Sequence, residues 1–128
     1  MGTRSLTYVY DDKTPVVCMY RQFDGYPTGH GAELADFLNG FEIVNGYGVV
    51  KPKLANGMSC LAAQMVAFFK VGVGGFYLEP VELGQDCGQD YEYHVYRDSI
   101  VILDSDRSEI FSGSWEQFYD FCVEKEVA

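Results

Sequence analysis

Residues 20–38 read YRQFDGYPTGHGAELADFL, and this stretch decides how the rest of the chain is arranged. The apolar, β-prone run at 16–20 that leads into it predicts a buried strand. A D-G and a Y-P pair then break the strand, because glycine permits positive φ and proline fixes its own φ while restricting the residue before it. Apolar residues follow at the spacing of one helix face, so we expect a helix that begins between positions 28 and 31.

The start of this helix has the composition of an anion-binding loop. The first peptide N–H groups of a helix lack intrahelical partners and lie at the positive end of its dipole, which suits phosphate or carboxylate. Arg21 adds a fork of donors, and the glycines let a ligand approach the backbone closely. We therefore predict a ligand site made of Arg21, Gln22, Asp24, Tyr26, Thr28, Gly29, His30 and Gly31. A structural connection explains the same pattern equally well, with Arg21 paired with Asp24 or Glu33.

The composition indicates one folded domain over residues 1–128. Apolar residues make up 48% of the chain and aromatic residues 16%, which excludes a disordered protein. No apolar run has transmembrane length and no basic-plus-apolar leader is present, so we expect a soluble protein without a signal peptide and no membrane partner. The four cysteines form no CxxC pair, which favours a reducing cytoplasm and predicts no zinc site. We expect no metal and no cofactor.

Charge is the second global signal. The formal net charge is −10, with six acids and five bases in residues 1–64 against thirteen acids and four bases in residues 65–128. A duplex-binding protein shows a basic face, so direct binding of duplex nucleic acid is disfavoured. An acidic face suits a basic protein surface instead, although an acidic surface also serves solubility alone.

The first half contains further expected elements. An alternating run at 6–10 and the strand at 16–20 predict a hairpin. Residues 41–50 read as a short strand or an extended loop. A second helix is expected over 60–70, with Asn56 or Ser59 as its N-cap. That helix is apolar nearly all round, which predicts burial or a shared interface in a homo-oligomer.

The second half predicts an antiparallel meander and a last helix. A strand is expected at 76–78, and strict alternation at 91–96 and an apolar run at 99–103 predict two more, followed by a short strand at 110–111. Ser114 and Gln117 form the sequence signature of a capping box. Together these elements predict an α+β fold, a single antiparallel sheet with about three helices packed on one side.

Motifs for catalysis are sparse. The two histidines are far apart in sequence, and no motif places a nucleophile beside Asp24, His30 and Glu33, the acid/base groups near the loop. The sequence therefore favours a binding protein over an enzyme. Ten tyrosines and nine phenylalanines supply faces on which a base stacks, so Arg21 and Tyr26 suit a phosphorylated, base-containing small molecule.

Residues 19–31, MYRQFDGYPTGHG, together with NGM at 56–58, CLAAQ at 60–64 and DYEY at 90–93, resemble a family of small phage and prophage proteins. No established activity comes with that family, so the resemblance assigns no catalytic residue. It implies a protein that acts in the cytoplasm of an infected bacterium. Small phage proteins of this size often blunt host defence.

Three functions follow from the residues and this resemblance. The first is a non-catalytic phage protein that binds and sequesters a nucleotide-derived immune messenger, of the cyclic nucleotide or ADP-ribose type. The alternative is an acidic inhibitor of a host defence complex, anti-CRISPR-like or a nucleic-acid mimic. The third is a small hydrolase of a nucleotide or phosphodiester.

Overall fold

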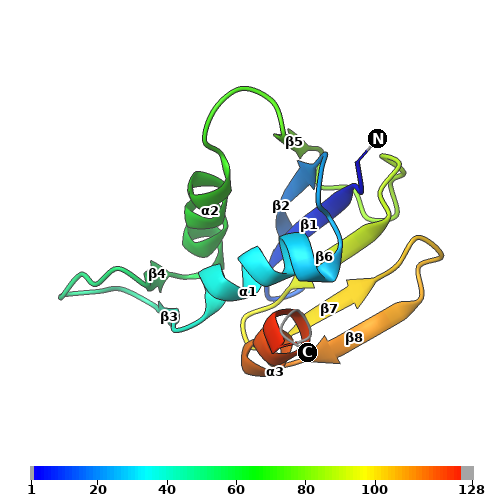
Figure 1. The fold of residues 1–128 in the computed structure, drawn as a ribbon. Helices are drawn as coiled ribbons and strands as arrows, with labels where there is room; N and C mark the ends of the chain where they lie inside the picture. Colours follow the sequence, from blue (N-terminus) through cyan, green and yellow to red (C-terminus); the bar gives the residue numbers. More distant parts are fainter. Residues whose placement is uncertain (1, 125–128) are drawn as a thin grey trace.

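The computed structural model describes residues 2–124 and has the expected α+β architecture (Figure 1). Within these residues, six strands form one sheet in the order β5-β2-β1-β6-β7-β8. The strands are β1 (Ser5–Asp11), β2 (Thr14–Arg21), β5 (Phe76–Glu79), β6 (Tyr91–Val95), β7 (Ile100–Leu103) and β8 (Glu109–Gly113). The helices are α1 (Ala32–Leu38), α2 (Met58–Phe69) and α3 (Trp115–Tyr119).

The hairpin of β1 and β2 forms as the sequence predicts. Asp11 lies opposite Thr14, so the connection is a two-residue turn. Asp12 in that turn has a φ of 58°. Aspartate tolerates this left-handed conformation because its short side chain bonds locally, and such turns match the twist of the strands they join.

The sheet differs from the expected antiparallel arrangement at its centre. β6 runs parallel to β1, with Ser5 opposite Tyr91 and Val9 opposite Val95, while the other neighbouring strands are antiparallel. β5 pairs with β2 at the edge, so it stands outside the meander of β6, β7 and β8. The long connection after β5 crosses the sheet, so that β6 runs in the same direction as β1. Parallel strands need a crossover connection of this kind.

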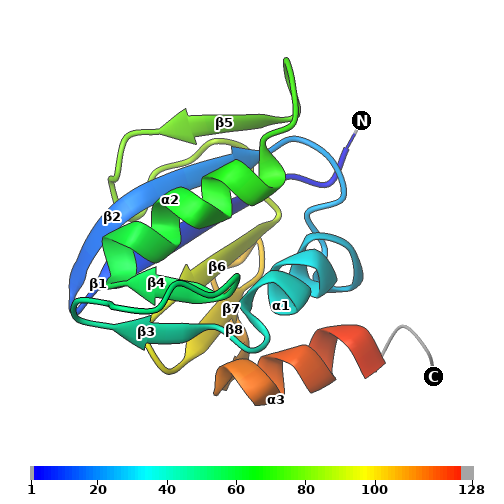
Figure 2. The same ribbon diagram turned by 90° about the vertical axis from the view of Figure 1, so that its left-hand side faces the viewer.

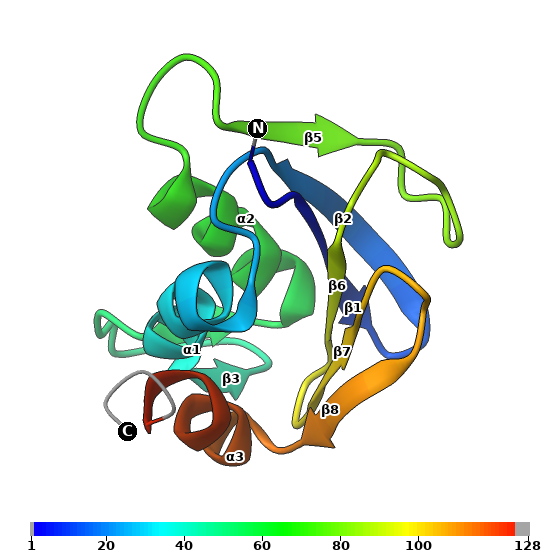
Figure 3. The ribbon, with the colours of Figure 1, turned by 45° about the vertical axis from the view of Figure 1, so that its right-hand side comes forward.

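All three helices cover one face of the sheet (Figures 2 and 3). Side chains of alternate strand residues meet them there and form the main core, which includes Val9, Tyr93, Ile102, Leu61 and Phe118, each with no exposed surface. On the opposite face a smaller apolar cluster consists of Leu6, Tyr8, Tyr10 and Cys18. The segment between β5 and β6 runs along that second face (Figure 3).

The second helix begins earlier than predicted and without the predicted cap. α2 starts at Met58, and the N-cap position is Gly57 with a φ of 84° and no side-chain bond. The Asn56 side chain is used elsewhere, where its Oδ1 accepts from the Gly46 N–H at 2.7 Å. Only one face of α2 is buried, while Phe68 remains 48% exposed. The expected homo-oligomer stays a prediction.

Residues 41–56 form a projecting arm, and the short strand predicted within 41–50 is part of it. β3 (Glu42–Val44) and β4 (Leu54–Asn56) pair in parallel, and the arm extends away from the body of the molecule (Figure 1). Lys53 Nζ ties its base to α1 by donating to the carbonyl oxygens of Asp36 and Asn39 at 2.8 and 2.6 Å. Of the helices in the described part of the chain, none is long and apolar enough to cross a membrane.

The capping box of the last helix is confirmed. Ser114 Oγ accepts from the Gln117 N–H at 3.1 Å, and Gln117 Oε1 accepts from the Ser114 N–H at 2.9 Å. These bonds satisfy two donors that a helix start leaves unpaired. α3 continues into a π-helical turn at Asp120–Glu124.

The substitution Ser114→Ala tests the cap. Losing its side-chain acceptor should lower the free energy of unfolding by about 1 kcal/mol in urea denaturation. Ser105→Ala, in an exposed turn, is the matched control and should change it by less than about 0.5 kcal/mol. Equal effects of the two substitutions would show that the box contributes nothing to stability.

Candidate functional site

Arg21, the last residue of β2, lies at the centre of a buried polar network. Its Nε donates to the Phe23 carbonyl oxygen at 2.6 Å. Its Nη2 donates to Glu33 Oε2 and its Nη1 lies by Glu33 Oε1, both at 3.2 Å, in a two-pronged ion pair. The guanidinium carbon also lies 4.9 Å from the centre of the Phe76 ring. With 9% of the residue exposed, Arg21 directs its donors into the protein.

His30 lies beneath Arg21 with no exposed surface. Its Nδ1 is 3.3 Å from Arg21 Nη1 and its Nε2 is 2.7 Å from Thr7 Oγ1. Because a guanidinium only donates, Nδ1 must accept, so the ring proton lies on Nε2 and is donated to Thr7. Burial, and then the charge of Arg21, lower the pKa of His30 from 6.5 to about 3. The ring is therefore neutral and inaccessible to a solute.

The start of the first helix does not offer the open N–H groups that the sequence predicts. A π-helical turn, Pro27–Gly31, precedes α1. Within it the N–H of His30 donates to the Asp24 carbonyl at 2.7 Å, and those of Gly29 and Gly31 donate to the Tyr26 carbonyl at 2.9 and 3.3 Å. These donors are already satisfied by the loop itself, since Asp24, with a φ of 62°, folds the chain back over the turn.

The glycines of the loop serve packing, where the sequence suggested an approach for a ligand. A Cβ at Gly29 would lie 2.6 Å from the Asp24 carbonyl oxygen and 2.8 Å from the Tyr26 ring. A Cβ at Gly31 would lie 2.9 Å from Cys122 Sγ. Backbone and side chains of the protein therefore fill the space that the missing side chains leave.

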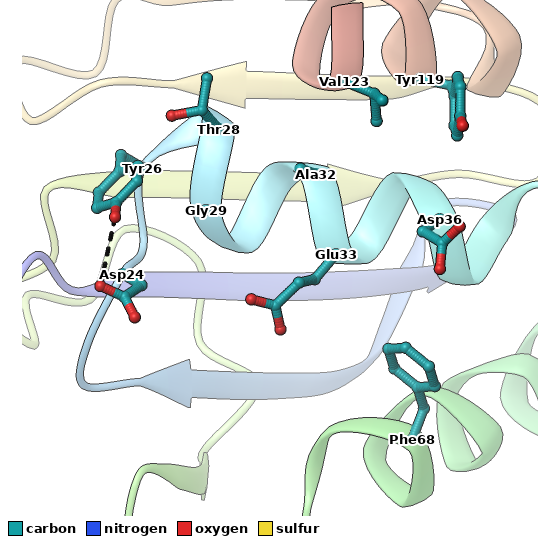
Figure 4. A pocket seen from close by; sticks show the side chains of 10 residues that line it. All are labelled: Asp24, Tyr26, Thr28, Gly29, Ala32, Glu33, Asp36, Phe68, Tyr119 and Val123. Atoms are coloured by element: carbon teal, nitrogen blue, oxygen red, sulfur yellow. Dashed lines mark hydrogen bonds between the residues drawn. The ribbon is translucent and has the colours of Figure 1, made fainter. Parts of the chain in front are cut away.

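A shallow depression of about 480 Å³ lies over α1, between the loop, α2 and the last helix (Figure 4). Its lining residues are Asp24, Tyr26, Thr28, Gly29, Ala32, Glu33, Asp36, Phe68, Tyr119 and Val123. Asp24 and Tyr26 are joined across its rim, where the tyrosine hydroxyl donates to Asp24 Oδ1 at 3.4 Å.

The predicted site residues divide between two layers. Asp24, Tyr26, Thr28 and Gly29 line the depression, together with Glu33, which the set did not include. Buried below them are Arg21, His30 and Gly31. Gln22 is absent from the lining, and its N–H donates to the Gly75 carbonyl at 2.9 Å.

The surface layer is acidic and aromatic. Three carboxylates face the depression, from Asp24, Glu33 and Asp36, and no basic side chain is among its described lining residues. Rings from Tyr26, Phe68 and Tyr119 complete it. The cation closest to these carboxylates in the network, Arg21, lies below Glu33 and is paired with it. Such a surface attracts positive charge and opposes an anion.

A second polar cluster, on the other face of the sheet, was not predicted as a site. Tyr10 Oη lies 2.7 Å from His94 Nδ1, and His94 Nε2 lies 3.0 Å from Glu92 Oε1. Arg107 Nη1 pairs with Glu92 Oε2 at 3.1 Å, and Tyr8 stacks on His94 with ring centres 5.0 Å apart. The alternation at 91–96 places Glu92 and His94 on that face, but it cannot show that the segment after β5 covers them.

Burial and neighbouring charges shift the pKa values of several groups on this face of the sheet. Burial alone raises the pKa of Glu92, but hydrogen bonds from His94 and Gln89 and the Arg107 charge outweigh it, so that pKa lies below its ordinary value. Burial raises the pKa of the Cys18 thiol to about 12, so a thiolate nucleophile does not form there at neutral pH. Burial also raises the pKa of Tyr8 and Tyr10.

Asp24 and Glu33 share the depression without the histidine that the sequence suggested beside them, because His30 is fully buried and neutral. Among residues 2–124, no group of three His, Cys, Asp or Glu side chains is placed to hold a metal ion.

No protein-family model, no curated protein and no solved structure matches the chain significantly. The resemblance to small phage proteins therefore stays a prediction. The depression and the network beneath it carry the functional argument.

The buried His30 predicts a specific loss of stability in acid. Its folded-state pKa, about 3, lies below the ordinary 6.5, so between these values the unfolded chain holds a proton that the folded protein excludes. The stability that comes from a neutral His30 is fully present above pH 6.5. Below pH 6.5 the free energy of unfolding falls by about 1.4 kcal/mol for each pH unit. Urea denaturation at a series of pH values from roughly 7.5 to 4.5 measures how the free energy of unfolding changes with pH.

The comparison variant is His30→Gln, which keeps a side-chain donor toward Thr7 but takes up no proton. The variant should be less stable than wild type at neutral pH. Below pH 6.5 its free energy of unfolding should fall less steeply with decreasing pH, by about 1.4 kcal/mol per pH unit, because one fewer proton is taken up on unfolding. Parallel curves for wild type and variant would contradict a neutral, buried His30.

Proposed function

We propose that the protein is a non-catalytic binding protein whose depression over α1 captures a positively charged segment of another protein. One observation carries the proposal: three carboxylates and three aromatic rings face one depression whose described lining contains no base. Carboxylates pair with guanidinium and ammonium groups, and aromatic faces attract the same cations. This is the chemistry of a surface for arginine- or lysine-rich segments.

The buried network supports this role by fixing the surface. Arg21 holds the Glu33 carboxylate by two contacts of 3.2 Å, so one of the three acids is oriented before a partner arrives. The net charge of −10 would add long-range attraction for a basic partner and speed the encounter. In an infected bacterium such a protein would act as an acidic inhibitor of a host defence complex, the role consistent with the phage resemblance.

Sequestration of a nucleotide-derived messenger is the second candidate, and Glu33 is the observation that favours it. Its carboxylate occupies the Arg21 fork in the position that a phosphate would take, and its side chain is 51% exposed. A ligand phosphate would displace Glu33 and take over its contacts with Arg21. The remaining carboxylates, Asp24 and Asp36, oppose this mode.

The substitution Glu33→Gln distinguishes the two candidate functions because it should change the affinity for a basic peptide and the affinity for a nucleotide in opposite directions. Removing the carboxylate should weaken binding of a labelled arginine-rich peptide by about two- to fivefold. The same change removes the carboxylate that competes with a phosphate for Arg21, so binding of a cyclic dinucleotide or of ADP-ribose should strengthen if that mode exists. Fluorescence anisotropy measures the peptide and calorimetric titration measures the nucleotides.

A matched set of charge variants supplies the control. Neutralising Asp24, Glu33 and Asp36 together should abolish most peptide binding, whereas neutralising Glu82, Asp106 and Glu109, which are exposed outside the depression, should weaken it only slightly. Equal losses for both triple variants would mean that net charge alone attracts the peptide. That result would refute the depression as the binding site.

A further inference from the structure

The strand β5 leaves one edge of the sheet without a neighbour. β5 is the outermost strand on its side and pairs only with β2 in the described sheet. Its side chains are unusually apolar for an edge, with Tyr77 47% and Leu78 62% exposed. Exposed edges of this kind are templates for pairing with another strand, and proteins ordinarily blunt them with charge or proline.

The ladder with β2 determines which backbone groups of β5 point outward. The Gln22 N–H donates to the Gly75 carbonyl at 2.9 Å, and the pairing continues without a bulge. Because bonded and non-bonded pairs alternate in an antiparallel ladder, the N–H and C=O of Leu78 point away from β2. The Phe76 carbonyl also points outward, and it accepts from Lys70 Nζ at 2.8 Å.

We propose that two copies of the chain pair through this edge, antiparallel about a two-fold axis at Leu78. In an antiparallel pair, residues opposite each other have their side chains on the same face of the sheet. The two-fold axis must therefore pass through a residue, because an axis between two residues would place opposite side chains on different faces. With the axis at Leu78, the two Leu78 residues exchange their outward N–H···O bonds. Tyr77 of each copy then lies opposite Glu79 of the other.

The chemistry around β5 matches a second copy in this register. Lys70 Nζ lies 5.5 Å from the centre of the Tyr77 ring. Glu79 of the second copy would therefore stand beside Lys70, and symmetry gives two such ion pairs. Pro80 falls opposite Phe76, where the missing proline N–H leaves nothing unpaired because Lys70 already occupies the Phe76 carbonyl.

An apolar groove completes the interface. It has a volume of about 220 Å³ beside the strand, and its lining is Met19, Val66, Lys70, Phe76, Tyr77 and Leu78. The Leu78 side chains of the two copies would meet over it and cover surface that is now in water. The half-buried Val66 of α2, which lines the same groove, joins the interface.

Sedimentation equilibrium of the full chain tests the pairing. Wild type should form a dimer at micromolar concentration, and Leu78→Lys, which sets two like charges against each other on the axis, should raise the dissociation constant by about tenfold or more. Val73→Lys is the control, because Val73 is fully exposed outside the strand. A monomeric wild type, or a dimer that Leu78→Lys leaves intact, would overturn the proposal.

Two further experiments test the register, each with thermal melts to confirm folding. Glu79→Lys should weaken the dimer by about two- to fivefold, because it sets a like charge beside Lys70 of the other copy. Leu78→Cys should form a disulfide between copies under mild oxidation, whereas Tyr77→Cys should not, because those positions lie more than about 7 Å apart in this register. Crosslinking through position 77 and not through position 78 would refute the register.

Discussion

The ion pair between Arg21 and Glu33, with His30 below it, is the interaction on which the loop and the first helix depend. The donors of Arg21, a residue that is only 9% exposed, must be satisfied, since a buried unpaired charge costs several kcal/mol. Phe23, His30 and Glu33 satisfy them, and these residues come from the loop, the π-helical turn and α1. One side chain therefore fixes three consecutive segments against the end of β2.

This network separates the charges of the molecule into layers. The cation lies inside, with a neutral histidine beneath it, and the carboxylates of Asp24, Glu33 and Asp36 face outward. On the other face of the sheet Arg107 pairs with the buried Glu92, and His94 Nε2 lies 3.0 Å from the same carboxylate. The outward surplus of acid over α1 is the basis for the basic partner that we propose, and it arises because the interior satisfies its own charges.

The sequence predicted local elements better than their partners. The hairpin, the meander and the Ser114 cap follow from alternation and from turn residues that lie close together in the chain. The parallel pairing of β6 with β1 does not, because it depends on where a long connection carries the chain. The same limit applies to the loop. Glu33 was one of the two partners predicted for a structural Arg21, but the complete burial of His30 depends on Tyr93 and Phe69, which lie far away in sequence.

The state of the His30 ring tests the closed network most directly. Long-range ¹⁵N–¹H NMR of the imidazole reports which nitrogen carries the proton and whether the ring titrates. The network requires a proton on Nε2, donated to Thr7, and one unchanged set of ring shifts from neutral pH down to the onset of acid unfolding. A ring that titrates near 6.5, or that carries its proton on Nδ1 facing Arg21, would contradict the account.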